Sequence, residues 1–181
     1  MKKWFLAMGL GATMVVIAAC DVSDVEQVET EQEEAEASEE SAVEEGGGEE
    51  EEVVEESISI GDTMNFDGLQ ITLNDAYTSA GSDWETPEND HYVILDLTIE
   101  NTTDEAANIS TMMQMSLQDG EGYTHNSTIY TETTGSLDGE IGPGRDNRGE
   151  VPFDVNASDE YEFIFENPFT SGQAIWTITD L

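Results

Sequence analysis

From Ile58 to Leu181 the chain alternates apolar and polar residues in short runs separated by turn-forming residues. The clearest run begins at Tyr92 and places several aliphatic side chains on one side of an extended strand, because neighbouring side chains of a strand point in opposite directions. This aliphatic set is Val93, Leu95, Leu97 and Ile99. Similar alternation predicts strands at 63–66, 69–74, 112–118, 151–155, 161–165 and 174–179. The pattern therefore predicts an all-β domain.

Turn signals divide these runs. Asp67 and Gly68 are typical of a two-residue hairpin turn, and the Gly-Pro-Gly at 142–144 reverses the chain before another run. Pro152 within that run predicts an edge strand or a bulge, because proline cannot donate to the ladder. No stretch has helical spacing, so about seven to nine short strands in 58–181 are predicted to form an antiparallel β-sandwich.

The core of this sandwich is expected to contain large apolar side chains. Trp84 and Trp176 are predicted as its aromatic anchors, Trp176 more strongly because its neighbours alternate. In the run at 112–118, Met113, Met115 and Leu117 are predicted to point inward.

Residues 1–19 have the three parts of an export signal: a positive start at Lys2 and Lys3, an apolar run, and small residues before a cleavage point. The run from 4 to 19 is shorter than the about 20 residues that a membrane-spanning helix needs. Ile17, Ala18, Ala19 and Cys20 together resemble a bacterial lipobox. The resemblance implies that Cys20 is lipidated and becomes the new N-terminus, with palmitate-type acyl chains holding the protein in the membrane. An uncleaved anchor and ordinary secretion are the alternatives.

Residues 20–57 are predicted to form a disordered acidic tether. Positions 21–57 hold 18 Asp and Glu residues and no basic or aromatic residue. Such a segment cannot bury enough apolar surface to offset its chain entropy. As a flexible coil it would span about 35 Å, and fully stretched about 120 Å. An alternative is that the acidic run captures basic proteins or metal ions.

The charge of the whole chain is strongly negative: 42 acidic residues stand against four basic ones, for a net charge of −38. From Cys20 onward only Arg145 and Arg148 are basic, and they are expected to pair with neighbouring carboxylates or to bind an anion. This charge excludes nucleic acid as a direct partner and favours cations or basic proteins. Adaptation to high salt is the alternative explanation of the acidity.

Candidate site chemistry is sparse. Four carboxylates, Asp83, Glu85, Glu88 and Asp90, lie within one loop, and such a cluster suits calcium, although the spacing is not that of an EF-hand. Solvated loop carboxylates are the alternative, and no other cofactor is predicted.

A stretch rich in serine and threonine contains Tyr123, His125 and Tyr130, a mixture typical of recognition loops. Alternatively, the tyrosines cap the sandwich. Neither His91 nor His125 lies in a nucleophile or zinc motif, and the single cysteine belongs to the lipobox. The chain is therefore predicted not to be an enzyme.

Several segments are together similar to the bacterial domain of unknown function 4352. They are 60–63, the strand at 92–100 with Asn101 and Thr102 after it, 117–123, 141–144 and 149–155. The resemblance implies an immunoglobulin-like sandwich of the kind displayed on lipoproteins or secreted proteins, and it implies no catalytic or binding residues.

The sequence thus predicts three parts: a signal peptide (1–19), a lipidated cysteine with its acidic linker (20–57), and an immunoglobulin-like antiparallel β-sandwich (58–181). The predicted function is a lipoprotein on the extracytoplasmic side of the cell membrane. It would display a binding or structural module at the cell surface to an unknown envelope or extracellular protein. The alternatives are a calcium-dependent binding module and an unrecognised envelope hydrolase.

Overall fold

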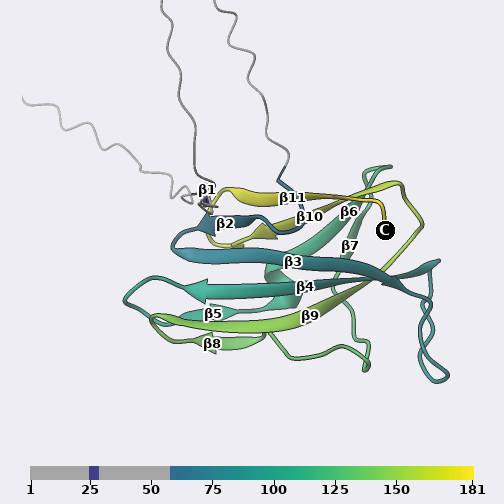
Figure 1. Ribbon diagram of the computed structural model, residues 1–181, viewed down its shortest axis with the longest axis horizontal. Coiled ribbons are helices and arrows are strands. Elements are labelled where there is room, and N and C mark those ends of the chain that lie inside the picture. Colours follow the sequence, from purple (N-terminus) through teal and green to yellow (C-terminus); the bar gives the residue numbers. More distant parts are fainter. Residues whose placement is uncertain (1–24, 29–57) are drawn as a thin grey trace, which may run out of the picture.

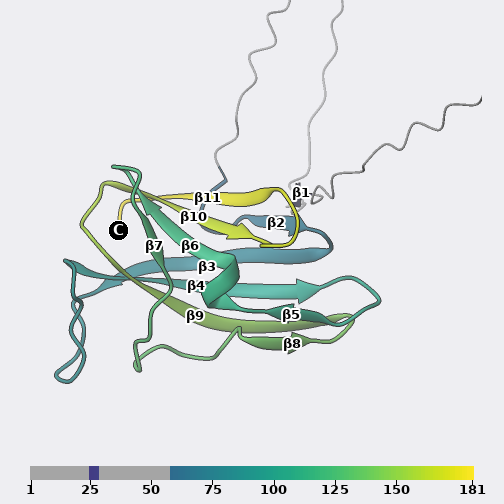
Figure 2. The same cartoon turned by 180° about the vertical axis from the view of Figure 1, so that it is seen from behind.

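The computed structural model describes residues 25–28 and 58–181. Its elements are antiparallel strands and one helical turn, arranged as two main layers (Figure 1, Figure 2). These elements are β1 (Val25–Val28), β2 (Thr63–Phe66), β3 (Leu69–Ser79), β4 (His91–Asn101), β5 (Ala107–Ile109), α1 (Thr111–Gln114), β6 (Met115–Asp119), β7 (Thr124–Asn126), β8 (Gly139–Ile141), β9 (Arg145–Val155), β10 (Glu160–Glu166) and β11 (Gln173–Thr179).

One sheet has the strand order β1-β2-β3-β4-β9, and the other has the order β11-β10-β6-β7. A small sheet of β5 and β8 accompanies them. Every strand pair is antiparallel, which confirms the predicted all-β antiparallel sandwich. Pro152 lies in β9, the last strand of the first sheet, where the loss of an N–H donor is tolerated as predicted.

The hairpin of β2 and β3 has the turn that its sequence predicts. Asp67 and Gly68 both have positive φ, 52° and 83°, as a two-residue turn of the primed type requires. Phe66 pairs with Leu69, so the hairpin register continues directly from this turn.

Between the two main sheets lies one continuous core made from the inward positions of both. The aliphatic set of β4 is fully buried there, and so are the aromatic residues of β10 and β11. The ring of Phe66 packs edge-to-face against the ring of Phe165 from the opposite sheet, with 5.3 Å between the ring centres. The ring centres of Phe163 and Trp176 lie 5.1 Å apart. Trp176 is completely buried and its indole N–H donates to the Asp62 carbonyl at 3.2 Å, so its predicted place in the core is correct.

The strand predicted at 112–118 begins later than expected. Residues Thr111–Gln114 form the turn α1, because the Ser110 carbonyl accepts from the Met113 and Gln114 N–H groups at 3.1 and 2.9 Å. The Gln114 side chain stabilises this turn by accepting from the Ser110 N–H at 2.7 Å. Met113 is consequently 57% exposed and not inward, whereas Met115 is buried as predicted, as is Leu117.

The segment predicted to be a disordered tether contains one ordered element. Residues 25–28 form β1 and pair with β2 at the edge of the first sheet, with Val25 opposite Phe66 and Val28 opposite Thr63. For these four residues the prediction of disorder is wrong. The signal peptide, the lipobox of Ile17 to Cys20, and the acidic run at 29–57 lie outside the described residues. Within the described ranges, the chain has no helix with the length and apolarity to span a membrane.

Candidate recognition end of the sandwich

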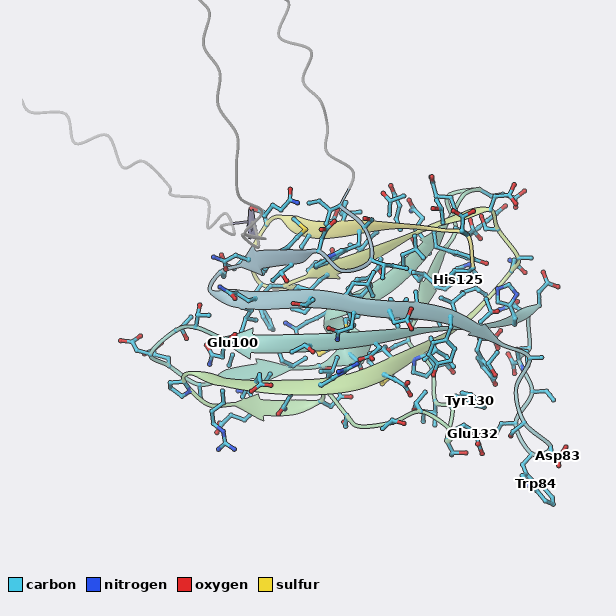
Figure 3. All side chains as sticks on the ribbon, in the orientation of Figure 1. Asp83, Trp84, Glu100, His125, Tyr130 and Glu132 are labelled. Atoms are coloured by element: carbon cyan, nitrogen blue, oxygen red, sulfur yellow. The ribbon has the colours of Figure 1, made fainter. Side chains whose placement is uncertain are left out.

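A long loop connects β3 to β4 and projects beyond the end of the strands (Figure 1). We call residues 80–90 the Trp84 loop. Trp84 lies at its tip, next to Asp83, and points away from the sandwich (Figure 3). Its side chain is 92% exposed, so the prediction that Trp84 anchors the core is wrong.

Hydrogen bonds within the Trp84 loop hold its tip. The Ser82 N–H donates to the Glu85 carbonyl at 2.7 Å, and the Ser82 hydroxyl accepts from the Glu85 N–H at 3.2 Å. Gly81 has a φ of +92°, and a Cβ at this position would lie 2.3 Å from the Glu85 carbonyl oxygen. Only glycine therefore allows the chain to fold back this tightly.

The base of the loop is fixed to β9 through Asp154. Its carboxylate accepts from the Glu88 N–H at 2.7 Å and from the Asn89 N–H at 2.9 Å. The Asn89 side chain also donates to the Asp154 carbonyl at 3.1 Å. These contacts join residues more than sixty positions apart, so the sequence around the loop does not reveal them.

A second segment supports the Trp84 loop from the side. We call residues 127–138 the Tyr130 segment. The Glu85 carboxylate accepts from the Thr131 N–H at 2.9 Å and also from the Thr131 hydroxyl. These hydrogen bonds hold the pKa of Glu85 below its usual range, because both donors favour the charged carboxylate.

Tyr130 fastens its own segment to the outer face of the first sheet. Its ring stacks on Tyr92 at 4.7 Å, and its hydroxyl lies 3.2 Å from the Ser79 hydroxyl. Tyr92, Ile94 and Tyr130 form a small apolar cluster of their own. Tyr130 is thus a buried cap of the sandwich. The exposed apolar side chain of this segment is Ile129, at 82%.

The other two residues of the predicted recognition loop belong to the β6–β7 hairpin of the second sheet, Tyr123 in its turn and His125 in β7. Tyr123 is 62% exposed, and His125 belongs to β7 with its Nε2 3.0 Å from the Asp119 carboxylate (Figure 3). The structure therefore separates Tyr123 and His125 from Tyr130. His91, the other histidine, places its Nε2 3.3 Å from the Tyr161 hydroxyl.

Asp119 organises the turn that carries Tyr123. Its buried carboxylate accepts from the His125 ring and from the N–H groups of Tyr123 and Glu121, the last two at 2.9 and 3.0 Å. The hydrogen bond from His125 is the main cause that lowers the pKa of Asp119. The pair has the geometry of a structural lock between β6 and β7.

We expect Asp119→Asn to lower the free energy of unfolding by about 1–2 kcal/mol at pH 7, because charge-assisted hydrogen bonds become neutral ones. Asp119 has a lower pKa when folded, so its contribution is complete above the ordinary aspartate pKa and is lost as pH falls through the folded value. Urea unfolding of the wild type and of Asp119→Asn should therefore show that the difference between their free energies of unfolding becomes smaller below about pH 4. A gap that stays constant down to pH 2.5 would contradict this assignment.

The four predicted calcium ligands do not converge. Glu85 accepts from Thr131, whereas the Asp90 carboxylate accepts from the Ala157 N–H at 3.0 Å, and Asp83 extends into solvent beside Trp84 (Figure 3). Glu88 is exposed. Among the described residues, no group of three or more histidine, cysteine, aspartate or glutamate side chains is placed to hold a metal ion. The calcium hypothesis gains no support from this arrangement.

The two arginines of the domain differ in whether they form an ion pair. Arg148 forms a two-pronged ion pair with Asp96, with its Nε 2.9 Å from one carboxylate oxygen, and this contact lowers the pKa of Asp96. Arg145 is exposed at the start of β9, and within residues 58–181 no carboxylate lies within ion-pair distance of it. The expected ion pair is thus present for Arg148 alone.

Comparison with known proteins gives the class of this domain. A family model described as a domain of unknown function (DUF4352) matches residues 58–175. This match covers more than half of the chain, and the chain belongs to that family, as its sequence motifs indicate.

Solved structures share the fold at low sequence identity. A Bacillus subtilis lipoprotein (ycdA) is 17% identical with a TM-score of 0.50; the match covers 68% of this chain and 37% of that protein. The B. subtilis protein yjhA is 13% identical with a TM-score of 0.53, over 67% of this chain and 98% of that one. The chain thus spans little more than a third of the length of the first of these proteins. A search among curated proteins found no match.

Proposed function

We propose that this protein is a lipid-anchored extracytoplasmic binding module that recognises its partner through the Trp84 loop. Cys20 supplies the anchor, the sandwich is the scaffold, and Trp84 is the main contact residue. The observation that carries the proposal is a tryptophan that is 92% exposed on a loop held by its own hydrogen bonds and by hydrogen bonds to two other segments, β9 and the Tyr130 segment.

An exposed tryptophan on an ordered loop calls for an explanation. Tryptophan is highly buried on average, and exposing its ring to water forgoes the stabilisation that burial would give. The Trp84 loop is already ordered, so a partner that covers the ring loses little additional loop entropy on binding. Tryptophan is also among the residues that contribute most to protein interfaces. These properties favour a preformed contact site.

The charges beside Trp84 indicate the chemistry of the partner. Asp83, Glu88 and Glu132 are exposed on the Trp84 loop and the Tyr130 segment. An apolar pocket bordered by lysine or arginine would complement a tryptophan surrounded by carboxylates. We therefore propose a protein partner in the envelope or outside the cell, and not a nucleic acid, which this charge would repel.

The proposed location has two sources of support. The lipobox residues Ile17 to Cys20 follow a segment with the length and charge of an export signal. Of the two B. subtilis proteins with a similar fold, ycdA is described as a lipoprotein. Two acyl chains are enough for stable attachment to a bilayer, whereas one chain gives only marginal binding.

Capture from an envelope extract tests this function. The lipid-free chain from residue 20 would be immobilised as wild type and as Trp84→Ala, and captured proteins would be quantified by mass spectrometry. We expect one or more proteins to fall at least about tenfold with Trp84→Ala, the loss typical of a central interface tryptophan. Phe169→Ala is the matched control, because Phe169 is also an exposed aromatic residue, at 84%, on the turn between β10 and β11. Equal capture by all three proteins would refute the site.

A further inference from the structure

The pairing of β1 decides at which end of the domain the chain arrives from Cys20. Val25 lies opposite Phe66, directly beside the Asp67-Gly68 turn. Only residues 21–24 separate Cys20 from β1. Even fully extended, the chain from Cys20 to Val25 spans no more than about 17 Å. A lipid on Cys20 would therefore hold this end of the domain close to the bilayer.

The Trp84 loop leaves from the opposite end of the same sheet. Leu69 pairs with Asn101 beside the hairpin turn, whereas Ser79 pairs with Tyr92 at the far end of β3 and β4. Each of these strands has 11 residues, so the two ends lie about 35 Å apart. The views of the ribbon agree, with β1 and the Trp84 loop at opposite ends of the long axis (Figure 1, Figure 2).

We propose that the pairing of β1 with β2 orients the domain on the membrane, with the Asp67 end toward the lipid and the Trp84 loop away from it. The part of the chain between the lipid and the domain is then residues 21–24. This inference rests on the lipid anchor of the proposed function. It goes beyond that function because it assigns the face that meets the bilayer and the role of β1.

Pairing of β1 is favourable for the sheet because it covers the edge of β2, which would otherwise present unpaired N–H and C=O groups. Charge does not provide the same orientation. The lipid-facing end carries Arg145, but it also carries exposed carboxylates on three elements or turns. These carboxylates are Asp67, Asp104, Glu105 and Asp146. An anionic bilayer would not attract this end, so the orientation depends on strand pairing.

Disulfide formation tests the pairing itself. In the lipid-free chain with Cys20→Ser, the pair Val28→Cys and Thr63→Cys joins register partners. The control pair, Glu26→Cys and Thr63→Cys, is offset by two residues on the same strands. Disulfides need Cβ atoms about 4 Å apart, so in a glutathione buffer we expect the first pair to oxidise at least about tenfold more readily. Equal oxidation of both pairs would overturn the role of β1.

Energy transfer to a membrane dye tests the orientation. The lipidated protein would be placed on vesicles that contain an acceptor lipid, with a donor dye on Asp104→Cys at the lipid-facing end or on Thr86→Cys in the Trp84 loop. We expect clearly higher transfer from position 104 than from position 86. The double substitution Glu26→Pro and Val28→Pro removes two ladder donors. In that background the difference should disappear and transfer from position 104 should fall.

The outcomes separate the two proposals. A protein that does not sediment with the vesicles overturns the lipid anchor and, with it, the orientation. A protein that sediments but gives equal transfer from positions 104 and 86 overturns the orientation alone. Higher transfer from position 86 than from position 104 overturns it as well.

Discussion

Replacing Cys20 with alanine should move the protein from the membrane fraction to the soluble fraction and abolish its labelling by a radioactive or clickable fatty acid. In the proposed function the thiol of Cys20 is the attachment point for the first lipid, and the chain has no second cysteine to replace it. Each buried methylene contributes about 0.8 kcal/mol, so losing the acyl chains removes most of the membrane affinity. The measurement is carbonate extraction of membranes followed by detection of the protein and its label.

Ser23→Ala is the control for this experiment, because it changes a small residue close to the same site. It should leave both the label and the membrane association intact. Retention of the fatty-acid label by Cys20→Ala would contradict the lipid anchor, and so would unchanged membrane association.

The second large effect is expected at Asn101, a completely buried polar residue at the end of β4. Its amide nitrogen donates to the Glu105 and Ile141 carbonyls at 2.7 and 2.9 Å. Its amide oxygen accepts from the N–H and hydroxyl of Thr103 at 3.0 and 2.7 Å. Asn101→Asp would replace the donating group with a carboxylate oxygen that faces two carbonyl oxygens.

We expect Asn101→Asp to lower the free energy of unfolding by about 3–5 kcal/mol at pH 7, because it buries a charge and places one of its oxygens against two carbonyl oxygens with no donor between them. Burial raises the pKa of such a carboxyl, so the loss should become smaller as the solution is acidified. Urea unfolding at pH 7 and pH 5 measures both effects. Asn108→Asp adds the same charge at an exposed position of β5 and should cost less than about 0.5 kcal/mol. Equal losses for both variants would contradict the account of Asn101.

The strands and the core could be predicted because the local pattern determines them. Alternation between residues 92 and 100 places Val93 and Leu95 in the core, and Trp176 is buried by the same rule. The turn at Asp67 and Gly68 depends on two adjacent residues, so it too could be predicted.

Features that depend on distant partners could not be predicted in this way. The position of Trp84 depends on Asp154 and Thr131, which lie in other parts of the chain, and residue-type preferences alone favoured burial. Strand β1 consists of four residues in an acidic segment, and it is ordered because it pairs with the edge of β2. A local signal was available for the start of the strand predicted at 112–118. The Gln114 side chain can accept a hydrogen bond from the Ser110 N–H and so favour a turn at these residues.

Photo-crosslinking on intact cells tests most directly whether the lipid-anchored domain presents Trp84 to a partner. A photoreactive phenylalanine analogue would be introduced at position 84 and, in a second strain, at position 169, where the native residues are both exposed aromatics. We predict a discrete protein adduct from position 84 in the membrane fraction and none of the same mass from position 169. No adduct from position 84, or the same adduct from both positions, would contradict the proposed recognition site.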